Sequence, residues 1–260
     1  MQVHRLASLV LASLASCSAP QLLLQATYGP YTPDGHVSLV DTSGGGVSAK
    51  SSLDDIGIDE DADTPGLRAD FKWGLPHLTV STQNSSWEGS GRVTGDFGGI
   101  PSGSDVDSEL DLALHRAILT FDLAPTDLLE LGLGFGVSVI DFRAQITETE
   151  PLIPGTVSES ADENVPVPLL AARAGGRLWR IDLEALVAGM TVKVDGGDAT
   201  YLELDLNGRL AIFGSHGELN GSLVAGWRSF DFDAEYDDGV DHVDTELTFT
   251  GPYVGLQLGF

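Results

Sequence analysis

The feature that most constrains the fold is a strict alternation of apolar and polar residues over most of the chain. The clearest run covers residues 202–210, where leucines at most alternate positions share one face. The opposite face of that run carries Glu203, Asp205, Asn207 and Arg209. Side chains of a β-strand point alternately to its two faces, so this period of two predicts strands with one apolar and one polar face.

The length of the runs separates a membrane barrel from a soluble sandwich. Strands of soluble proteins are usually about five to six residues long, whereas a strand that crosses a bilayer needs about 9–11 residues. The run from Leu129 to Val139 meets the longer requirement, and its polar face includes Gly132, Gly134 and Gly136. Glycines on an inner face fit a narrow barrel in which backbones and long side chains approach closely. We therefore expect an all-β protein: a closed, antiparallel, up-and-down transmembrane β-barrel with its apolar face outward.

Short and long connections alternate along the chain, as in barrels with short periplasmic turns and long outer loops. The short connections lie at 74–76, 124–126, near Gly176 and at 214–217, and the long ones at 51–65, 88–107, 148–163, 195–198 and 231–246. Between them we expect about ten strands, near residues 36–50, 66–73, 77–87, 108–123, 127–147, 165–176, 181–194, 200–213, 217–230 and 245–260. The first is the least regular, because Gly44-Gly45-Gly46 interrupts it. Without it, an even strand number would give eight.

The N-terminus has the layout of a targeting segment. The first 33 residues contain no acidic side chain, and a short basic start is followed by an apolar stretch rich in Leu and Ala. This pattern predicts a secretory signal peptide over residues 1–16. Leu14-Ala15-Ser16-Cys17 resembles the bacterial lipobox, which makes Cys17 a candidate lipidation site. The alternative is that Cys17 is only a small residue near an ordinary cleavage site. We expect residues 17–35 to lie in the periplasm and residues 36–260 to form the barrel.

The C-terminus carries a resemblance to a known class. The chain ends with apolar residues at alternate positions and a terminal Phe, and the residues of this signal are Tyr253, Leu256, Leu258 and Phe260. It resembles the signal by which the barrel-assembly machinery reads the last strand of bacterial outer-membrane proteins. The chain thus looks like a small barrel of the OmpA, OmpW and OmpX-like class. The resemblance implies the bacterial outer membrane, periplasmic termini, and surrounding lipid and lipopolysaccharide. It brings no catalytic or binding motif.

The polar face of the expected barrel is rich in both signs of charge. Six basic and six acidic residues are predicted to point inward: Arg68, Asp70, Lys72, Glu130, Arg173, Arg177, Glu184, Glu203, Asp205, Arg209, Glu218 and Arg228. The whole chain, by contrast, has 13 Lys plus Arg against 39 Asp plus Glu. Because charges removed from water need partners, we expect a lumen sealed by ion pairs rather than a narrow pore. The strand around His115 and Arg116 can be read in either register, so both residues stay unassigned.

The long connections are strongly acidic. They contain 25 acidic residues against one basic residue, Arg92. Clustered carboxylates suit Ca²⁺ or Mg²⁺, and the candidate ligands are Asp59, Asp61, Asp63, Asp231, Asp233, Glu235 and Asp237. The first cluster lacks the glycine that an EF-hand loop needs, so we expect loose, non-specific divalent binding and no other cofactor. A net charge of −26 argues against nucleic acid as a partner.

These observations favour a structural or surface-interaction protein over an enzyme. An outer-membrane hydrolase is the alternative, either lipid-modifying or similar to the omptin proteases, which use an Asp–His pair at the barrel rim. Only Asp241-His242 supports the omptin comparison. His77, His115, His216 and His242 are available, but no local motif identifies a nucleophile.

Overall fold

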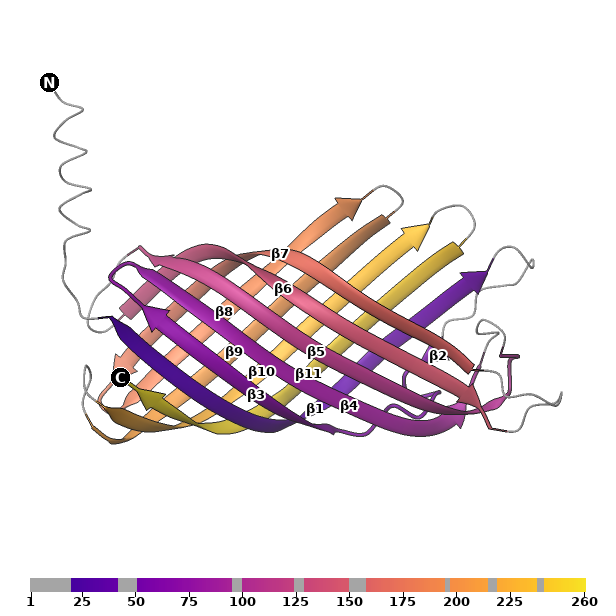
Figure 1. Cartoon of the computed structure of the whole chain (residues 1–260), viewed down its shortest axis with the longest axis horizontal. Helices are drawn as coiled ribbons and strands as arrows, with labels where there is room; N and C mark the ends of the chain where they lie inside the picture. Colours follow the sequence, from indigo (N-terminus) through magenta and orange to yellow (C-terminus); the bar gives the residue numbers. More distant parts are fainter. Residues whose placement is uncertain are drawn as a thin grey trace, which may run out of the picture.

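A computed structural model shows a closed β-barrel (Figure 1). It describes residues 20–41, 51–94, 100–123, 129–149, 158–194, 197–214, 219–237 and 241–260. Ten antiparallel strands pair in sequence order, and the ring closes where the last strand pairs with the first. The closed up-and-down barrel of ten strands, rather than eight, is thereby confirmed. No helix in the described part of the chain is long and apolar enough to span a membrane.

The ring consists of long strands joined by turns and loops. Its members are β1 (Gln21–Asp41), β3 (Ala62–Lys72), β4 (Pro76–Arg92), β5 (Asp105–Asp122), β6 (Leu129–Glu148), β7 (Ser158–Leu178), β8 (Ile181–Val194), β9 (Gly197–Phe213), β10 (Asn220–Asp237) and β11 (Asp241–Gly259). A two-residue strand, β2 (Ser51–Ser52), pairs only with β1. β1 begins and β11 ends at the same end of the barrel (Figure 1). Short turns mark this end as the periplasmic one in barrels of this kind.

The wall reverses its polarity along the strands, most clearly in β6. From Leu129 to Val139 the outward side chains are Leu, Phe and Val, while the inward ones are Glu130, three glycines and a serine. From Ile140 to Thr147 the outward side chains are Asp, Arg, Gln and Thr, and the inward ones are Ile, Phe and Ala. The first stretch has the length of one bilayer crossing, about 9–11 residues. The strand therefore continues beyond the membrane as the wall of a water-exposed barrel.

The outward apolar band surrounds the periplasmic half of the molecule. It is exposed on the other strands as well, for example at Leu24, Leu67, Phe121, Leu202 and Leu256. An apolar surface of this extent is stable only against lipid. The band and the closed ring identify a transmembrane barrel, and they support the predicted location in the bacterial outer membrane.

Two inward glycines of β6 show why this narrow wall needs residues without a side chain. A Cβ atom on Gly134 would lie 1.9 Å from the Leu119 carbonyl oxygen, and one on Gly136 would lie 2.4 Å from the Ala117 carbonyl oxygen. Both oxygens belong to the neighbouring strand β5. The predicted close approach at these glycines therefore occurs between the backbones of two strands.

The first strand of the ring lies earlier in the chain than we predicted. Residues 21–35, expected in the periplasm, belong to β1 and pair with β3 and β11. The pattern hides this strand because Leu22-Leu23-Leu24 is apolar on both faces and because Pro30 and Pro33 remove backbone donors. The pairing of β1 with β11 is interrupted between Tyr28 and Thr32. Residues 1–19, with the expected signal peptide and Cys17, and residues 42–50 lie outside the described residues.

The strands also extend into regions that we predicted as long connections. β4 continues to Arg92 and β5 begins at Asp105, so the expected connection 88–107 is partly strand. The same holds for 231–246, which contains the end of β10 and the start of β11. Outside the membrane the outer face of a strand contacts water, and acidic residues at alternate positions fit that face. Such residues resemble a loop in the sequence although they are part of the wall.

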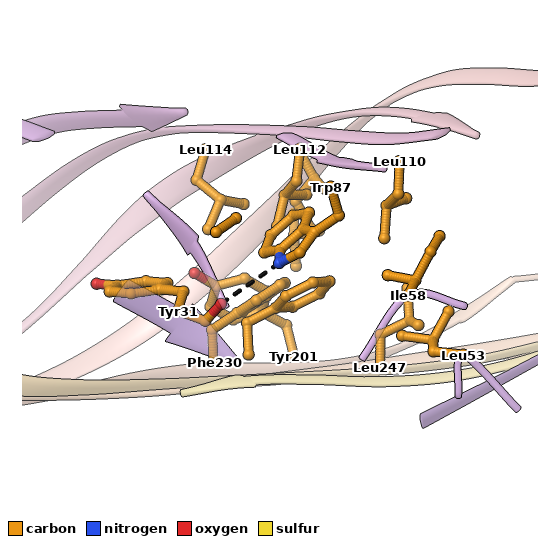
Figure 2. Packing of buried hydrophobic residues seen from close by; sticks show 14 of the residues in the cluster. Tyr31, Leu53, Ile58, Trp87, Leu110, Leu112, Leu114, Tyr201, Phe230 and Leu247 are labelled. Carbon is orange, nitrogen blue, oxygen red and sulfur yellow. Dashed lines mark hydrogen bonds between the residues drawn. The ribbon is translucent and has the colours of Figure 1, made fainter. Parts of the chain in front are cut away.

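An apolar core fills the extracellular half of the lumen (Figure 2). Each of the ten strands contributes at least one buried residue, for example Tyr31, Ala62, Trp87, Leu110, Ile140, Leu169, Leu186, Tyr201, Phe230 and Phe249. The ring centroids of Phe249 lie 5.1 Å from those of Trp87 and 5.6 Å from those of Phe230. The Trp87 indole donates a hydrogen bond to the Tyr31 carbonyl oxygen at 3.3 Å. The Trp87–Phe249 contact joins two strands, β4 and β11, that have β3 and β1 between them in the ring.

Residues 51–62, which we call the outer plug, complete this core. Their side chains Leu53, Ile56 and Ile58 are buried in the same cluster. Figure 2 places Leu53 and Ile58 close to Leu247 of β11. The outer plug therefore covers the extracellular end of the apolar core with apolar side chains of its own.

Glycines on the inner face of β4 make room for the outer plug. A Cβ atom on Gly89 would lie 1.8 Å from the Gly57 carbonyl oxygen, and one on Gly91 would lie 2.2 Å from the Asp55 carbonyl oxygen. Gly57 itself has a φ of 81°, a conformation that favours glycine. The Arg92 amide donates to the Asp55 carbonyl oxygen at 2.7 Å. The plug thus lies directly against the backbone of the wall.

Candidate functional site

The membrane-spanning half of the lumen contains ion pairs that join opposite walls. Arg68 on β3 pairs with Asp70 (Nε–Oδ2 2.8 Å) and with Glu184 on β8 (Nη2–Oε1 2.5 Å). In the ring, β3 and β8 have four other strands between them in either direction. All three side chains are buried. The Arg68–Glu184 pair therefore crosses the lumen at its full width.

Asp205 on β9 is the centre of a second group of contacts. Its Oδ2 atom lies 2.6 Å from Arg228 Nη2, 3.7 Å from Arg68 Nη1 and 3.8 Å from Arg116 Nη2. The Tyr253 hydroxyl donates to its other oxygen at 2.6 Å. The Asp205 side chain is 0% exposed. One fully buried carboxylate thus forms ion pairs with three guanidinium groups.

Glu203 connects these ion pairs to the apolar core above them. It accepts hydrogen bonds from Arg116 and, at 2.8 Å, from the hydroxyl of Tyr201. The Tyr201 ring lies 5.0 Å from the ring of Phe230 in the apolar core. Tyr201 therefore has its hydroxyl group among the ion pairs and its ring in the apolar core above them.

A third group of ion pairs lies towards the periplasmic end. Arg173 pairs with Asp122 at 2.5 Å and with Glu130 at 3.0 Å. Lys72 donates to Glu130, and its Nζ lies 3.4 Å from Asp122. Lys72 and Glu130 are only partly buried, with side chains 25% and 32% exposed. This group forms the periplasmic boundary of the ion pairs in the lumen.

Arg209 on β9 adds a further cation to the first group, with Nη2 2.9 Å from Glu184 Oε2. With it, the charges of the three groups balance. Six cations face six carboxylates: Arg68, Lys72, Arg116, Arg173, Arg209 and Arg228 against Asp70, Asp122, Glu130, Glu184, Glu203 and Asp205. Each of these groups has at least one partner of opposite charge, which offsets the cost of removing it from water. We refer to these twelve residues as the charged layer.

The structure places ten of the twelve predicted inward residues in the charged layer. Arg177 instead lies at the periplasmic rim, where its Nε is 2.5 Å from Asp182 and its side chain is 41% exposed. Glu218 lies outside the described residues. Of the predicted assembly signal, Leu256, Leu258 and Phe260 are exposed on the outer face. Tyr253 differs, because it points inward to Asp205.

Sequence reasoning missed three members of this site: Arg116, Asp122 and His77. The inner face of β5 begins with leucines in the extracellular half and continues with Arg116 and Asp122 in the membrane. That change of polarity along one face made the register ambiguous. His77 is buried on β4, with Nε2 3.2 Å from Asp70 Oδ1, and its only sequence signal is its position in an alternating strand.

The predicted metal ligands whose side chains the structure describes lie on the surface of the extracellular half. Asp59, Asp61, Asp63 and Asp233 are exposed, and Asp231 accepts a hydrogen bond from Thr248 at 2.9 Å. The side chains of Glu235 and Asp237 lie outside the description. Among the side chains that the structure describes, no three His, Cys, Asp or Glu residues are grouped so that they could hold a metal ion. The structure therefore brings no candidate metal site together in its described part.

The structure describes the side chains of two of the four candidate catalytic histidines, His77 and His115, and they lie on opposite faces of the wall. His115 lies on the outer face, where Nε2 is 3.4 Å from Asp141, and His77 lies inside. His216 is outside the described residues. The backbone of Asp241 and His242 belongs to β11 and pairs with β1 and β10, but their side chains are outside the description. The omptin-like pair, Asp241 and His242, thus remains a prediction from the sequence.

A cavity of 380 Å³ lies at the periplasmic end of the charged layer. Its walls include Asp70, Glu184 and Arg209 from the layer together with His77, and its rim includes Arg177. In the extracellular half, the apolar core occupies the lumen. The lumen is thus accessible from the periplasmic side as far as the ion pairs.

Comparison with known proteins supports the fold and does not give a family. No family model matches the chain, and no curated protein matches it. Among solved structures, the outer-membrane protease OmpT of Escherichia coli is similar with a TM-score of 0.60 at 8% identity, covering 94% of this chain and 99% of OmpT. Neisserial surface protein A gives a TM-score of 0.36 at 14% identity over 94% and 100% of the two chains. A FadL homologue of Pseudomonas aeruginosa gives 0.30 at 12% identity over 95% and 91%. The chain has the fold of a bacterial outer-membrane β-barrel protein.

Proposed function

We propose that this outer-membrane barrel is a closed structural or surface-interaction protein, and that it neither conducts solutes nor catalyses a reaction. The observation that supports this most directly is the apolar core, in which side chains from all ten strands meet on the barrel axis. Below that core, ion pairs such as Arg68–Glu184 join opposite walls. A barrel of this size has an interior that its side chains can fill.

The test is planar-bilayer conductance of the refolded barrel, with an open porin refolded in the same way as positive control. A closed lumen should give no conductance steps at voltages where the porin conducts. Discrete, reproducible steps would overturn the proposal and support the narrow pore instead. Ions can pass only if both the apolar core and the charged layer are open, so the measurement decides between a closed barrel and a pore.

The interaction surface of this proposal is the outer wall of the extracellular half. Its acidic residues, among them Glu109, Asp111 and Asp141, stand just above the apolar band. Divalent ions bound loosely there can bridge these carboxylates to the phosphate groups of lipopolysaccharide. Lipopolysaccharide retention on the purified barrel should then fall when Mg²⁺ is chelated. Unchanged retention would contradict the interaction with lipopolysaccharide, and only the structural role would remain.

The hydrolase alternative is supported by one feature, a ten-stranded barrel whose strands continue beyond the membrane, as the likeness to OmpT in fold indicates. It requires a polar site at the rim, where Asp241 and His242 belong to the paired backbone of β11. If His242→Ala and Asp241→Ala abolished a hydrolytic activity of the purified, folded protein, the interaction role would be wrong. Equal residual hydrolysis in wild type and both variants would mean a contaminant.

A further inference from the structure

We propose that the periplasmic cavity is a binding site for a small ligand that carries an oxyanion, a carboxylate or a phosphate group. The cavity has a volume of 380 Å³, within the range of about 300–1,000 Å³ that is typical of ligand pockets. Strands β1, β3, β4, β6, β7, β8 and β9 all contribute to its wall. It is therefore a feature of the ring as a whole and not of one loop.

The cavity is open to the periplasm at a rim of partly exposed charges. The rim contains two ion pairs, Lys72–Glu130 and Arg177–Asp182, whose side chains are between 25% and 41% exposed. Beneath them lie Glu184 and Arg209, with side chains 1% and 10% exposed. A ligand from the periplasm would therefore meet partly exposed charges first and buried charges at the base.

The charges that line the cavity are balanced, but their capacity for hydrogen bonds is not. The four lining carboxylates are all engaged: Asp70 by Arg68, His77 and Thr79, Glu184 by Arg68 and Arg209, Glu130 by Lys72 and Arg173, and Asp182 by Arg177. Among the described residues, three buried nitrogens of the lining have no hydrogen-bond partner: Arg173 Nε, Arg209 Nε and His77 Nδ1. One lining oxygen, Asp70 Oδ2, also has none, but it lies 2.8 Å from Arg68 Nε in an ion pair.

This imbalance decides the ligand class. The one unbonded acceptor of the wall, Asp70 Oδ2, already lies against the Arg68 guanidinium, whereas two guanidinium Nε–H donors have no such partner. A ligand therefore gains most by bringing acceptor oxygens. Arg209 is the best placed cation, because its ion pair with Glu184 uses a single nitrogen, Nη2, at 2.9 Å. A guanidinium group offers five N–H donors in a fixed fork that matches carboxylate and phosphate oxygens. Small side-chain rotations at Arg209 and Arg173 would direct their Nε groups to such a ligand.

The experiment uses the full refolded barrel in detergent, with inorganic phosphate and acetate as probes against chloride at matched ionic strength. The reporter is the NMR signal of the His77 imidazole, which lines the cavity and is buried. We expect a saturable shift with phosphate, with acetate or with both. A shift with phosphate alone indicates phosphate esters as the ligand source, and a shift with acetate extends the class to carboxylates.

Variants connect the shift to the cavity. Arg209→Gln should weaken the apparent affinity about tenfold or more, the effect of losing one charge-assisted hydrogen bond. Arg177→Gln at the rim should weaken it less, and it serves as the deciding variant if Arg209→Gln does not refold. Arg180→Gln is the matched control. Arg180 lies at the turn between β7 and β8, close to Arg177, and donates to the carbonyl oxygens of Ala211 and Ile212, outside the cavity.

Three results would overturn the proposal. The first is an absent shift, and the second is a linear one that follows ionic strength, which would mean that the cavity holds only water. The third is a saturable shift that is the same in wild type, Arg209→Gln and Arg177→Gln. The test is independent of whether the barrel conducts, because it reports on the periplasmic side of the charged layer alone.

Discussion

The two halves of this barrel place their apolar side chains on opposite faces of the wall. In the membrane-spanning half, the apolar side chains of β6 face outward and Glu130 faces the lumen. In the extracellular half of the same strand, Asp141 faces outward and Ile140 faces the lumen. The backbone geometry is continuous through the change. What differs is the medium outside the wall.

The position of the apolar side chains follows from that medium. Against lipid, the outer face is the dry one, and the lumen is left to polar groups that satisfy one another. Against water, the lumen is the only dry place, so it becomes a core like that of a soluble protein. The change from ion pairs to aromatic packing near Tyr201 and Glu203 therefore marks the level at which the wall leaves the membrane.

The largest effect should come from removing the central carboxylate of the charged layer. Asp205→Ala leaves Arg68, Arg116 and Arg228 without the oxygen that they share, in a space closed to water. Breaking such a buried group typically costs about 3–5 kcal/mol of unfolding free energy. The measurement is urea unfolding of the barrel in lipid vesicles, followed by tryptophan fluorescence.

The matched control for that variant is Asp233→Ala, which removes an exposed acid from the outer wall of the extracellular half. We expect a change within about 0.5 kcal/mol, as for most surface substitutions. Equal, small effects of the two substitutions would mean that water reaches Asp205, and the contrast between the two halves would then be wrong at its centre.

A second pair of variants locates the boundary between the halves on the outer face of β6. Leu133→Arg puts a charge into the apolar band and should cost about 2–4 kcal/mol near the bilayer midplane. Gln145→Arg puts the same charge on the same face of the same strand, above the band, and should cost little. Moving the arginine along the outward positions between them would map where the penalty disappears. A penalty that is independent of position would contradict the assignment of the band.

Much of the fold was predictable because it rests on a period of two. The ring of ten strands, its outward apolar face and most of the inward charges follow from strict alternation, as in the run from Leu202 to Leu210. Alternation fixes which residues share a face, but it does not say which face is inside. That choice came from strand length, and it holds only where lipid surrounds the barrel.

The errors fall where the alternation is disturbed or where water, not lipid, surrounds the barrel. β1 was displaced because three consecutive leucines and two prolines disturb its alternation. The register around Arg116 was ambiguous because leucines precede it on the same inner face, on the extracellular side of the change in medium. The sequence predicts only a loop at the outer plug, because the burial of Leu53, Ile56 and Ile58 depends on all ten strands closing around them. No local pattern contains that information.

The smallest of the expected effects concerns Arg209, at the periplasmic edge of the charged layer. Arg209→Ala removes the 2.9 Å pair with Glu184, but Glu184 keeps Arg68 at 2.5 Å and Arg173 at 3.8 Å. The remaining carboxylate is thus still compensated, so we expect a loss of about 1–3 kcal/mol, below that of Asp205→Ala. Arg92→Ala is the control, because it breaks the exposed pair with Asp105 in the extracellular half and should cost about 0–1 kcal/mol. Urea unfolding in the same vesicles should order the three variants as Asp205→Ala, Arg209→Ala and Arg92→Ala. If Arg209→Ala matched Asp205→Ala, the charged layer would be one cooperative unit up to the cavity, and its edge would be as closed to water as its centre.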